Sequence, residues 1–470
     1  MGTPCVHSDE MRTRFSKAMS EMYRREVPQY GTLMDLVADV NNNALAKDPE
    51  LRDTLARHGE LGRLSIERHG AIRLGTPEEL FNIRRVFAVM GMFPVGYYDL
   101  SIAGVPVHST AFRPIDDEAL RRNPFRAFTS LLRLELIEDE GLRAEAAEIL
   151  ANRRIFTSRA LTLVERAEKE GGLGESEADE FVEEICETFR WHSDATVTLR
   201  TYERLHDAHR LVADVVSFKG PHINHLTPRT LDIDAVQAEM PKRGIAPKAV
   251  IEGPPRRKYA ILLRQTSFKA LEENINFKPG ADGTSSGTHT ARFGEIEQRG
   301  IALTAEGRKL YDRLLASVCG DVQVVSTGGN SGDYNRRLIE IFKQFPDDWD
   351  ELRREGLAFF RYSVTEKGRR EASRGLSPAT IEALIAQGYV RFDPIIYEDF
   401  LPVSAAGIFQ SNLGTDAQQN YSEHSNRTAF EQALGSSVQN ELELYAEAEQ
   451  WSLSRTYQEL GLARPAVASA

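Results

Sequence analysis

The stretch LSIERHGAIRLGTPEE at residues 64–79 holds two patterns in direct succession, and together they determine the expected fold. Residues 64–74 suggest alternation of apolar and polar side chains, which is typical of a strand. The tetrad Thr76–Glu79 is typical of a helix start, because threonine can cap, proline suits the first helical position and the glutamate can bond back to the cap. The stretch therefore predicts a strand, followed by Gly75, and a helix from Pro77 to about Met90.

The same order of elements occurs twice along the chain. Two short strands are expected at 95–102 and 105–112, which completes a β-α-β-β unit with His69 on its first strand. The order returns after residue 220, although residue identities do not repeat. There we expect a strand at 221–227, a helix at 232–243 and strands at 248–252, 259–271 and 291–299.

The remaining segments are expected to be largely helical. With 470 residues the chain is long enough for two or three folding units. We predict an α+β fold in which two such modules form a central curved sheet, with a helical insertion and helical terminal regions. The expected parts are N-terminal helices at 1–60, a first module at 61–113, an insertion at 114–219, a second module at 220–300 and a C-terminal helical region at 301–470.

The charge of the chain argues against nucleic acid and anionic membranes as partners. Lysine and arginine number 58 against 70 aspartate and glutamate, for a formal net charge of -12. No general electrostatic attraction then draws the chain to a polyanion. A small anionic substrate would have to be bound by local cations.

Three cysteines, at positions 5, 186 and 319, are too few and too scattered for a disulfide framework or a thiolate zinc site. Residues 1–10 are polar and lack the apolar region of a signal peptide, and no apolar stretch is long enough to span a membrane. We therefore expect a cytoplasmic protein.

Among the eleven histidines, three are expected on the first strands of the two modules: His69, His222 and His225. Because a strand points alternate residues to opposite faces, only one of His222 and His225 can face a given pocket, and the register leaves both possible. Isolated histidines are expected in ordinary packing; these are His58, His108, His192, His289 and His424.

A carboxylate and a cation could complete a site around these histidines. Glu295 and Glu297 share one face of a strand, where a core sheet would normally place apolar residues. Two imidazoles and one carboxylate are the ligand set of a redox-active iron with three open positions. Arg73 shares a strand face with His69, and a guanidinium can hold a carboxylate in a bidentate fork.

These residues carry a family resemblance. The paired β-α-β-β-β modules resemble the vicinal oxygen chelate architecture, and residues 293–299, FGEIEQR, resemble the last-strand motif of 4-hydroxyphenylpyruvate dioxygenase and hydroxymandelate synthase. Residues 67–73, ERHGAIR, together with residues 222–229 and the Glu295 strand, resemble the bacterial 2-oxoadipate dioxygenase/decarboxylase family more closely. This resemblance covers nearly the whole chain.

The resemblance implies a complete site in two metal-binding modules. Fe(II) would be bound by His69, His225 and Glu295, and Glu297 stands where the two related enzymes have an apolar residue. Arg73 would act as the catalytic residue that holds the substrate. The residues implied in substrate binding are His69, Arg73, Gln265, Val403 and Ser404, the last two on a loop of the C-terminal region.

The implied reaction converts 2-oxoadipate and O2 to 2-hydroxyglutarate and CO2, in lysine catabolism. Two other interpretations stay open at this point. Imidazole and carboxylate also bind Zn(II), Ni(II) or Mn(II), so another vicinal oxygen chelate metalloenzyme, an isomerase or hydrolase, would have the same ligands. A non-catalytic sensor of dicarboxylates is the third possibility.

Overall fold

The computed structural model describes residues 5–248, 250–280, 285–321, 331–377, 379–401 and 426–464. It combines helices with several small sheets, in agreement with the predicted mixture of α and β elements. The chain divides into two compact units, each described by itself below. The first contains residues 1–252, 264–298 and 400–439, and the second contains residues 253–263, 299–399 and 440–470.

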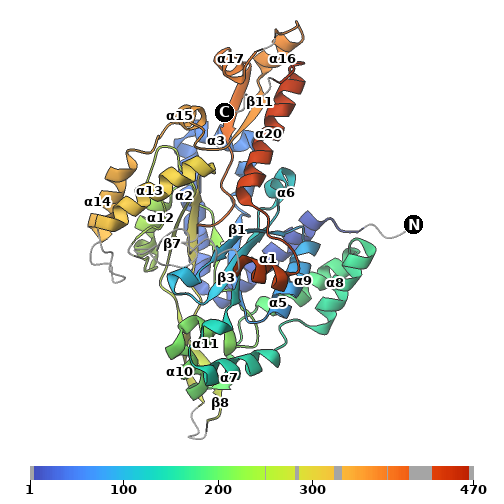
Figure 1. Cartoon of the computed structure of the whole chain (residues 1–470), viewed down its shortest axis with the longest axis vertical. Helices are drawn as coiled ribbons and strands as arrows, with labels where there is room; N and C mark the ends of the chain where they lie inside the picture. The colour runs from blue at the N-terminus through green and yellow to red at the C-terminus, as the bar shows by residue number, and fades with distance from the viewer. Residues whose placement is uncertain are drawn as a thin grey trace. The chain divides into compact units, whose positions relative to one another are not determined.

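The first unit contains a five-stranded sheet with the order β2-β3-β4-β1-β6 (Figure 1). β1 pairs with β4 in parallel and with β6 in antiparallel register, whereas β3 is antiparallel to both β2 and β4. β1 therefore has a neighbour on each side. The strands are β1 (Arg68–Leu74), β2 (Phe93–Asp99), β3 (Val107–Arg113), β4 (Arg126–Leu132) and β6 (Leu226–Pro228).

The predicted strand and helix at the start of the first module are confirmed, the strand over residues 68–74. Helix α5 (Pro77–Val89) follows β1, and its first turn contains the expected capping box. The Glu79 amide donates to the Thr76 hydroxyl at 3.2 Å, and the Glu79 carboxylate accepts from the Thr76 amide at 3.3 Å. Ile83, Val86 and Phe87 form the buried face of the helix.

Strand β4 lies inside the segment predicted as a helical insertion, so that prediction was wrong for residues 126–132. All seven of its residues are buried, and three of them, Arg126, Thr129 and Ser130, are polar. A strand buried on both faces has no alternating pattern to detect. β5 (Asp194–Thr198) is a second strand there; the helices are α6 (Asp117–Arg122), α7 (Glu140–Ala151), α8 (Ser158–Glu170), α9 (Glu175–Phe189), α10 (Leu199–Ala208) and α11 (Arg210–Val216).

The strands of the second module are divided among several sheets, so the predicted single central sheet is not confirmed. β6 joins the five-stranded sheet, β7 pairs with β10, and β8 and β9 form a separate sheet with β5. An isolated bridge between Arg229 and Glu297 links β10 to the residue after β6. The expected helix at 232–243 is present as α12 (Ile233–Glu239) and a 3-10 turn. The remaining strands are β7 (Leu263–Ser267), β8 (Glu272–Lys278), β9 (Ser286–Thr290) and β10 (Glu295–Arg299).

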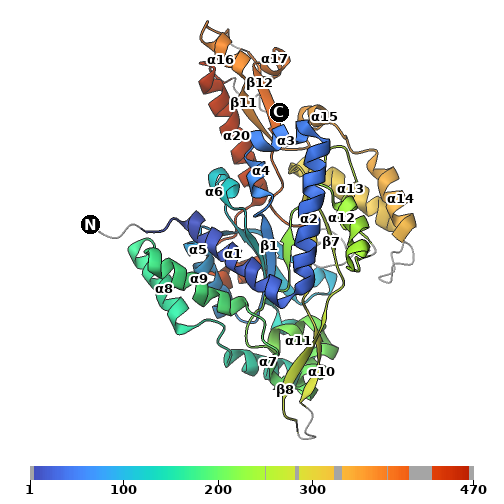
Figure 2. The ribbon, with the colours of Figure 1, turned by 180° about the vertical axis from the view of Figure 1, so that it is seen from behind.

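The predicted N-terminal helices are confirmed as α1 (Ser8–Glu26) and α2 (Pro28–Lys47), followed by α3 (Pro49–Arg57) and α4 (Glu60–Arg63). Figure 2 shows α1 and α2 in front of β1. The Tyr23 hydroxyl, on α1, lies 2.8 Å from the carbonyl oxygen of Asn224 and 2.7 Å from that of Phe293. Helix α1 therefore contacts two segments, at Asn224 and at Phe293, that are 69 residues apart in sequence.

The second unit contains a two-stranded sheet within the region predicted as helical. Strands β11 (Phe360–Val364) and β12 (Val390–Pro394) pair in antiparallel register. No helix in the described ranges has both the length and the apolar character needed to cross a membrane. The helices of this unit are α13 (Ala305–Asp321), α14 (Ser331–Phe342), α15 (Trp349–Arg354), α16 (Glu366–Ala372), α17 (Ile381–Ala386) and α20 (Glu441–Glu459).

Candidate metal centre

Three residues predicted as ligands lie together in the first unit. His69 is on β1, His225 directly precedes β6, and Glu295 begins β10. Their potential ligand atoms all lie within 4.8 Å of one another. Oε1 of Glu295 is 3.1 Å from Nε2 of His69 and 3.9 Å from Nε2 of His225. The structure thus brings together two imidazoles and one carboxylate at a largely buried position.

Close backbone approach at two glycines makes this convergence possible. A Cβ atom on Gly70 would lie 2.5 Å from the Ile223 side chain and 3.2 Å from the His225 carbonyl oxygen. A Cβ atom on Gly294 would lie 2.1 Å from the ring of Phe268. Each glycine is the immediate neighbour of a candidate ligand, so the absence of a side chain there lets the ligand-bearing segments come close.

The protonation of two of the three side chains, His225 and Glu295, suits metal binding. Burial, supplemented by the charges of His69 and Arg73, lowers the pKa of His225 to about 4, so its imidazole is neutral near pH 7. Burial would raise the pKa of Glu295, but the two histidines outweigh it and lower that pKa. A neutral imidazole and an ionised carboxylate are the forms that bind metal ions.

Glu297 lies on the other side of His69 from Glu295. Its Oε2 is 2.8 Å from Nδ1 of His69, and the carboxylate is fully buried. Burial would lower the pKa of His69, but Glu297 and Glu295 outweigh it and raise that pKa. The two glutamates that the sequence could not distinguish therefore have different positions. Glu295 lies near Nε2 of both His69 and His225, and Glu297 contacts Nδ1 of His69.

A buried network of charges continues behind Glu297. Arg126 lies 3.8 Å from Glu297 and 2.9 Å from Glu67. Glu67 in turn contacts Arg63 and Arg229 at 3.1 and 3.0 Å. Glu60, 2.6 Å from Arg229, brings the network to three arginines and three glutamates. The charges balance, as buried ions require.

Two polar side chains hold the Glu295 carboxylate. Gln265 Nε2 donates to Oε1 of Glu295 at 2.8 Å, and the Thr227 hydroxyl donates to the same oxygen at 3.3 Å. Gln265 was expected to contact substrate; here it contacts the candidate ligand. Thr227 was missed, although it lies directly opposite His69 in the pairing of β1 with β6.

Lys248 and Glu252 are two further charged groups that sequence reasoning missed. Their side chains lie 3.6 Å apart, and the backbones of Glu252 and Gln265 exchange hydrogen bonds at 2.8 and 3.0 Å. Burial, together with the charge of Glu295, raises the pKa of Glu252 to about 7. No pattern in the local sequence distinguishes these two residues from ordinary surface charges.

The ring of Phe400 closes another side of His69. The two ring centroids are 4.9 Å apart, and Phe400 also packs against Phe128 at 5.1 Å. Val403 and Ser404, the two predicted loop residues, lie outside the described residues.

Arg73 forms an ion pair with Asp214, with Nη1 2.6 Å from Oδ2. The charge of Arg73 is one of those that lower the pKa of His225. Asp214 also belongs to a second group of potential ligands, with His222 and His289. The register question thus has a clear structural outcome, because His225 joins the group with Glu295 and His222 joins the other. His289, expected in ordinary packing, also belongs to the second group.

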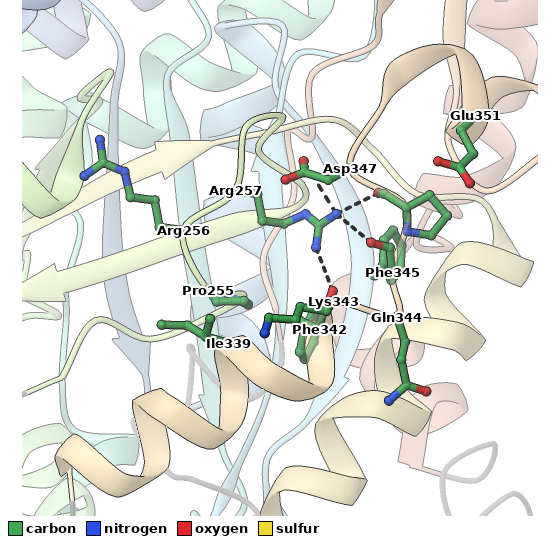
Figure 3. Close-up of a pocket in the computed structure, with 11 residues that line it drawn as sticks. Pro255, Arg256, Arg257, Ile339, Phe342, Lys343, Gln344, Phe345, Asp347 and Glu351 are labelled. Carbon is green, nitrogen blue, oxygen red and sulfur yellow. Dashed lines mark hydrogen bonds and ion pairs between the residues drawn. The ribbon is translucent and has the colours of Figure 1, made fainter.

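A cavity of about 420 Å³ in the second unit has a different character. The residues that line it, as far as the chain is described, include no histidine. Figure 3 shows the Arg257 guanidinium directed at backbone carbonyl oxygens, and it donates to those of Phe345 and Pro346 at 2.9 and 2.7 Å. This arginine holds a loop in place, so the histidine–glutamate group is the stronger candidate for a functional site.

Comparison with known proteins finds the same family over most of the chain. The family model described as 2-oxoadipate dioxygenase/decarboxylase matches residues 15–412. Proteins of that name from Pseudomonas putida and Escherichia coli are each 58% identical, over 97% and 96% of this chain and 98% of their own length. One from Mycobacterium tuberculosis is 38% identical over 88% of this chain and 89% of its own.

The similarity extends to solved structures. The hydroxyglutarate synthase from Pseudomonas putida, crystallised in complex with 2-oxoadipate, superposes with a TM-score of 0.92 at 56% identity. The match covers 98% of this chain and 100% of the other.

Proposed function

The chain belongs to the 2-oxoadipate dioxygenase/decarboxylase family, and from this premise we propose that it converts 2-oxoadipate and O2 to 2-hydroxyglutarate and CO2 with Fe(II). The observation that carries the proposal is the convergence of His69, His225 and Glu295, with ligand atoms within 4.8 Å of one another. The equation balances without a second co-substrate, because one 2-oxo acid supplies both the carboxylate that is lost and the carbon that is hydroxylated.

The side chains present fit an iron ion. Two imidazoles and one carboxylate are the donor set of non-haem Fe(II) oxygenases, and they leave open positions for substrate and O2. Among the described residues, Nδ1 of His225 is buried without a hydrogen-bond partner, and Nε2 of that ring lies 3.9 Å from Oε1 of Glu295. Iron bound by these residues would supply the redox chemistry for dioxygen activation, which amino-acid side chains lack.

The protein's own groups would position the reactants. Gln265 and Thr227 hold Oε1 of Glu295, which fixes the direction of the carboxylate. Glu297 contacts Nδ1 of His69 and so fixes the orientation of the ring. Hydrogen-bonded partners of this kind orient the ligands of metal sites.

Arg73 is the group that would recognise the substrate. A 2-oxo acid with two carboxylates would place its keto-acid end at the metal ligands and its distal carboxylate at the guanidinium. The distance between these two anchors would then select the chain length. C1 would leave as CO2, the former C2 would become a carboxylate carbon, and the former C3 would carry the new hydroxyl group.

The order of elements is consistent with two related modules of the vicinal oxygen chelate type. In the first, β1 carries His69 and is followed by α5 and β2 to β4. In the second, β6 follows His225 and precedes α12 and β7, and β10 carries Glu295. Involvement in lysine catabolism and a cytoplasmic location both stay predictions.

The decisive experiment is an oxygen-electrode assay on protein loaded anaerobically with Fe(II). With 2-oxoadipate we expect one O2 consumed for each 2-hydroxyglutarate formed, and no consumption by the Zn(II)-loaded protein. Absence of oxygen consumption with every 2-oxo dicarboxylate tested would contradict the proposal. Conversion of the substrate by the Zn(II)-loaded protein at the same rate as by the Fe(II)-loaded protein would instead indicate isomerase or hydrolase chemistry.

A further inference from the structure

A second buried polar group surrounds Asp214, on α11 of the segment predicted as a helical insertion. Oδ1 of Asp214 is 2.9 Å from Nε2 of His289 and 3.3 Å from Nε2 of His222, and Oδ2 is 2.6 Å from Nη1 of Arg73. The Tyr202 hydroxyl lies 2.8 Å from the other ring nitrogen of His289. A continuous chain of contacts therefore leads from Tyr202 through His289 and Asp214 to Arg73.

The protons in this chain have defined positions. A carboxylate only accepts hydrogen bonds, so Nε2 of His289 carries the proton that it donates to Asp214. In the neutral tautomer of His289, Nδ1 is then the acceptor for the Tyr202 hydroxyl. Burial would raise the pKa of Asp214, but Arg73, His222 and the hydrogen bonds outweigh it and hold that pKa well below its usual range. Asp214 is thus ionised and faces a cation.

Aromatic rings shield the group from water. Trp191 lies 4.6 Å from the ring of His222, and Phe218 lies 4.8 Å from that of His289. The side chain of Asp214 is 7% exposed, whereas that of Arg73 is 26% exposed. The anionic end is therefore fixed in the protein and the cationic end reaches partly into solvent.

Asp214, His222 and His289 could be considered as a second metal site. Their contacts argue against it. A metal ion would have to displace the proton on Nε2 of His289. It would also lie next to the Arg73 guanidinium, whose nitrogen is 2.6 Å from the Asp214 carboxylate. Like charges that close are repulsive in a buried environment.

The guanidinium retains free donors for a ligand. Among the described residues, Asp214 is the one hydrogen-bond partner of Arg73, and the bond uses Nη1. Nε and Nη2 remain for a carboxylate, which guanidinium groups bind in a two-point fork.

We propose that Asp214, held by His289 and Tyr202, is a positioning residue that fixes the Arg73 guanidinium at the distance from the metal ligands that suits a six-carbon 2-oxo dicarboxylate. This inference rests on the proposed function, because it assigns Arg73 to the distal carboxylate. It gives the α10–α11 segment a role in substrate selection, since that segment contributes both Tyr202 and Asp214.

The test compares Asp214→Asn with Asp207→Asn, an exposed aspartate on neighbouring α10. For Asp214→Asn we expect KM for 2-oxoadipate to rise about tenfold or more, the effect of losing one charge-assisted contact. We expect unchanged iron per chain, a kcat within about twofold of the parent enzyme and a smaller preference for 2-oxoadipate over 2-oxoglutarate. Anaerobic calorimetric titration of 2-oxoadipate into the Zn(II)-loaded protein should show the same loss of affinity. Asp207→Asn should match the parent in every measurement.

Two further variants separate positioning from folding. Tyr202→Phe removes only the hydroxyl and should raise KM in the same direction by a smaller factor. Asp214→Glu keeps the charge but moves it by one methylene. It should therefore change the ratio of kcat/KM for 2-oxoadipate and 2-oxoglutarate, with little change in the free energy of unfolding.

Each other outcome has a definite meaning. Parent-like KM, affinity and selectivity for Asp214→Asn would overturn the inference alone, with the proposed function intact. So would a lower kcat or iron content without a change in KM, which would indicate a structural role. A second metal equivalent per chain that is lost in Asp214→Asn would overturn it in favour of a metal site. If the parent protein neither binds nor turns over 2-oxoadipate, the proposed function and this inference fail together.

Discussion

Glu297 lies 2.8 Å from Nδ1 of His69 and so contacts the ring nitrogen opposite the one that faces the candidate metal ligands. The contact is possible because Glu295 and Glu297 are two residues apart on β10 and point to the same side, where His69 lies between their carboxylates. A carboxylate on the second nitrogen of a metal-binding histidine fixes the orientation of the ring and raises its basicity. Glu297 therefore supports the site without being a member of the ligand group.

Glu297→Gln should weaken iron binding without abolishing it. The amide has the same shape but no charge, and loss of such an outer partner typically costs about 10- to 100-fold in metal affinity or activity. Iron retained per chain during dialysis against a graded chelator measures the effect. Glu272→Gln, an exposed position on β8, is the matched control. Equal iron retention by both variants would show that the His69 contact has no influence on the metal.

The ligand assignment predicts which variants lose iron altogether. His69→Ala, His225→Ala and Glu295→Ala should each contain less than a tenth of the parent's iron, because two remaining donors bind Fe(II) weakly. His222→Ala should retain it, since His222 contacts Asp214 instead. Metal analysis after anaerobic loading checks all four. Loss of iron from His222→Ala with retention in His225→Ala would reverse the register.

Local patterns explain why part of this arrangement could be predicted. The capping box at Thr76 and Glu79 marks the end of β1 and the start of α5, so the strand that carries His69 was recognisable. The ligand set rested on a family resemblance as well, because residue spacing alone left His222 against His225 and Glu295 against Glu297. The predicted single central sheet is not confirmed, since β7 and β10 form a two-stranded sheet that is joined to the end of β6 by the bridge between Arg229 and Glu297.

The parts that could not be predicted depend on contacts distant in sequence. His289 and Asp214 are 75 residues apart, and neither lies in a pattern that distinguishes it from ordinary packing. β4 was missed because its buried residues do not alternate with exposed ones. Val403 and Ser404 stay predictions, since they lie outside the described residues.

The buried charge network behind Glu297 predicts how stability changes with pH. Burial would raise the pKa of Glu60, but Arg63 and Arg229 outweigh it, so that pKa is lowered. A carboxyl with a lowered folded pKa contributes stability that is present above its unfolded pKa, about 4.3, and is lost as the pH falls through the folded value. Glu60→Gln should therefore cost about 3 kcal/mol at pH 7, as breaking a buried ion pair does.

The difference between Glu60→Gln and the parent should shrink as the pH falls below about 4, because the unfolded parent then binds a proton at Glu60 that the folded parent takes up only at lower pH. Urea unfolding of the metal-free proteins at several pH values measures it. Glu50→Gln, at an exposed position on α3, should show a small difference at every pH. A Glu60→Gln deficit that stays constant down to pH 3 would contradict the lowered pKa.

The assignment of Arg73 to the distal carboxylate predicts chain-length selectivity. The five-carbon acid 2-oxoglutarate would end about 1.3 Å short of the guanidinium, and a misplacement of about 1 Å can cost about a hundredfold in rate. We expect the parent to use 2-oxoglutarate poorly and Arg73→Ala to retain iron while losing most of its preference for 2-oxoadipate. Steady-state kinetics with both acids measures this. Equal turnover of the two acids by the parent enzyme would remove the basis for the assignment.

Gly70→Ala should disturb the centre through the backbone alone. The added Cβ would lie 2.5 Å from the Ile223 side chain and 3.2 Å from the His225 carbonyl oxygen, so the segment with His225 would have to move away from β1. Overpacking of this kind costs about 1–3 kcal/mol, and we expect weaker iron retention in addition. Gly62→Ala on α4, where a Cβ would meet nothing within 4 Å, should be neutral or slightly stabilising.

The double variant Gly70→Ala/Ile223→Ala distinguishes close approach from a general loss of stability. Truncation of Ile223 removes the nearest clash but leaves the His225 carbonyl, so the two substitutions should be non-additive and iron retention should recover in part. Urea unfolding and iron content of the four proteins complete the cycle. Strict additivity, or a Gly70→Ala variant as stable as Gly62→Ala, would mean that the missing side chain at Gly70 does not govern the position of His225.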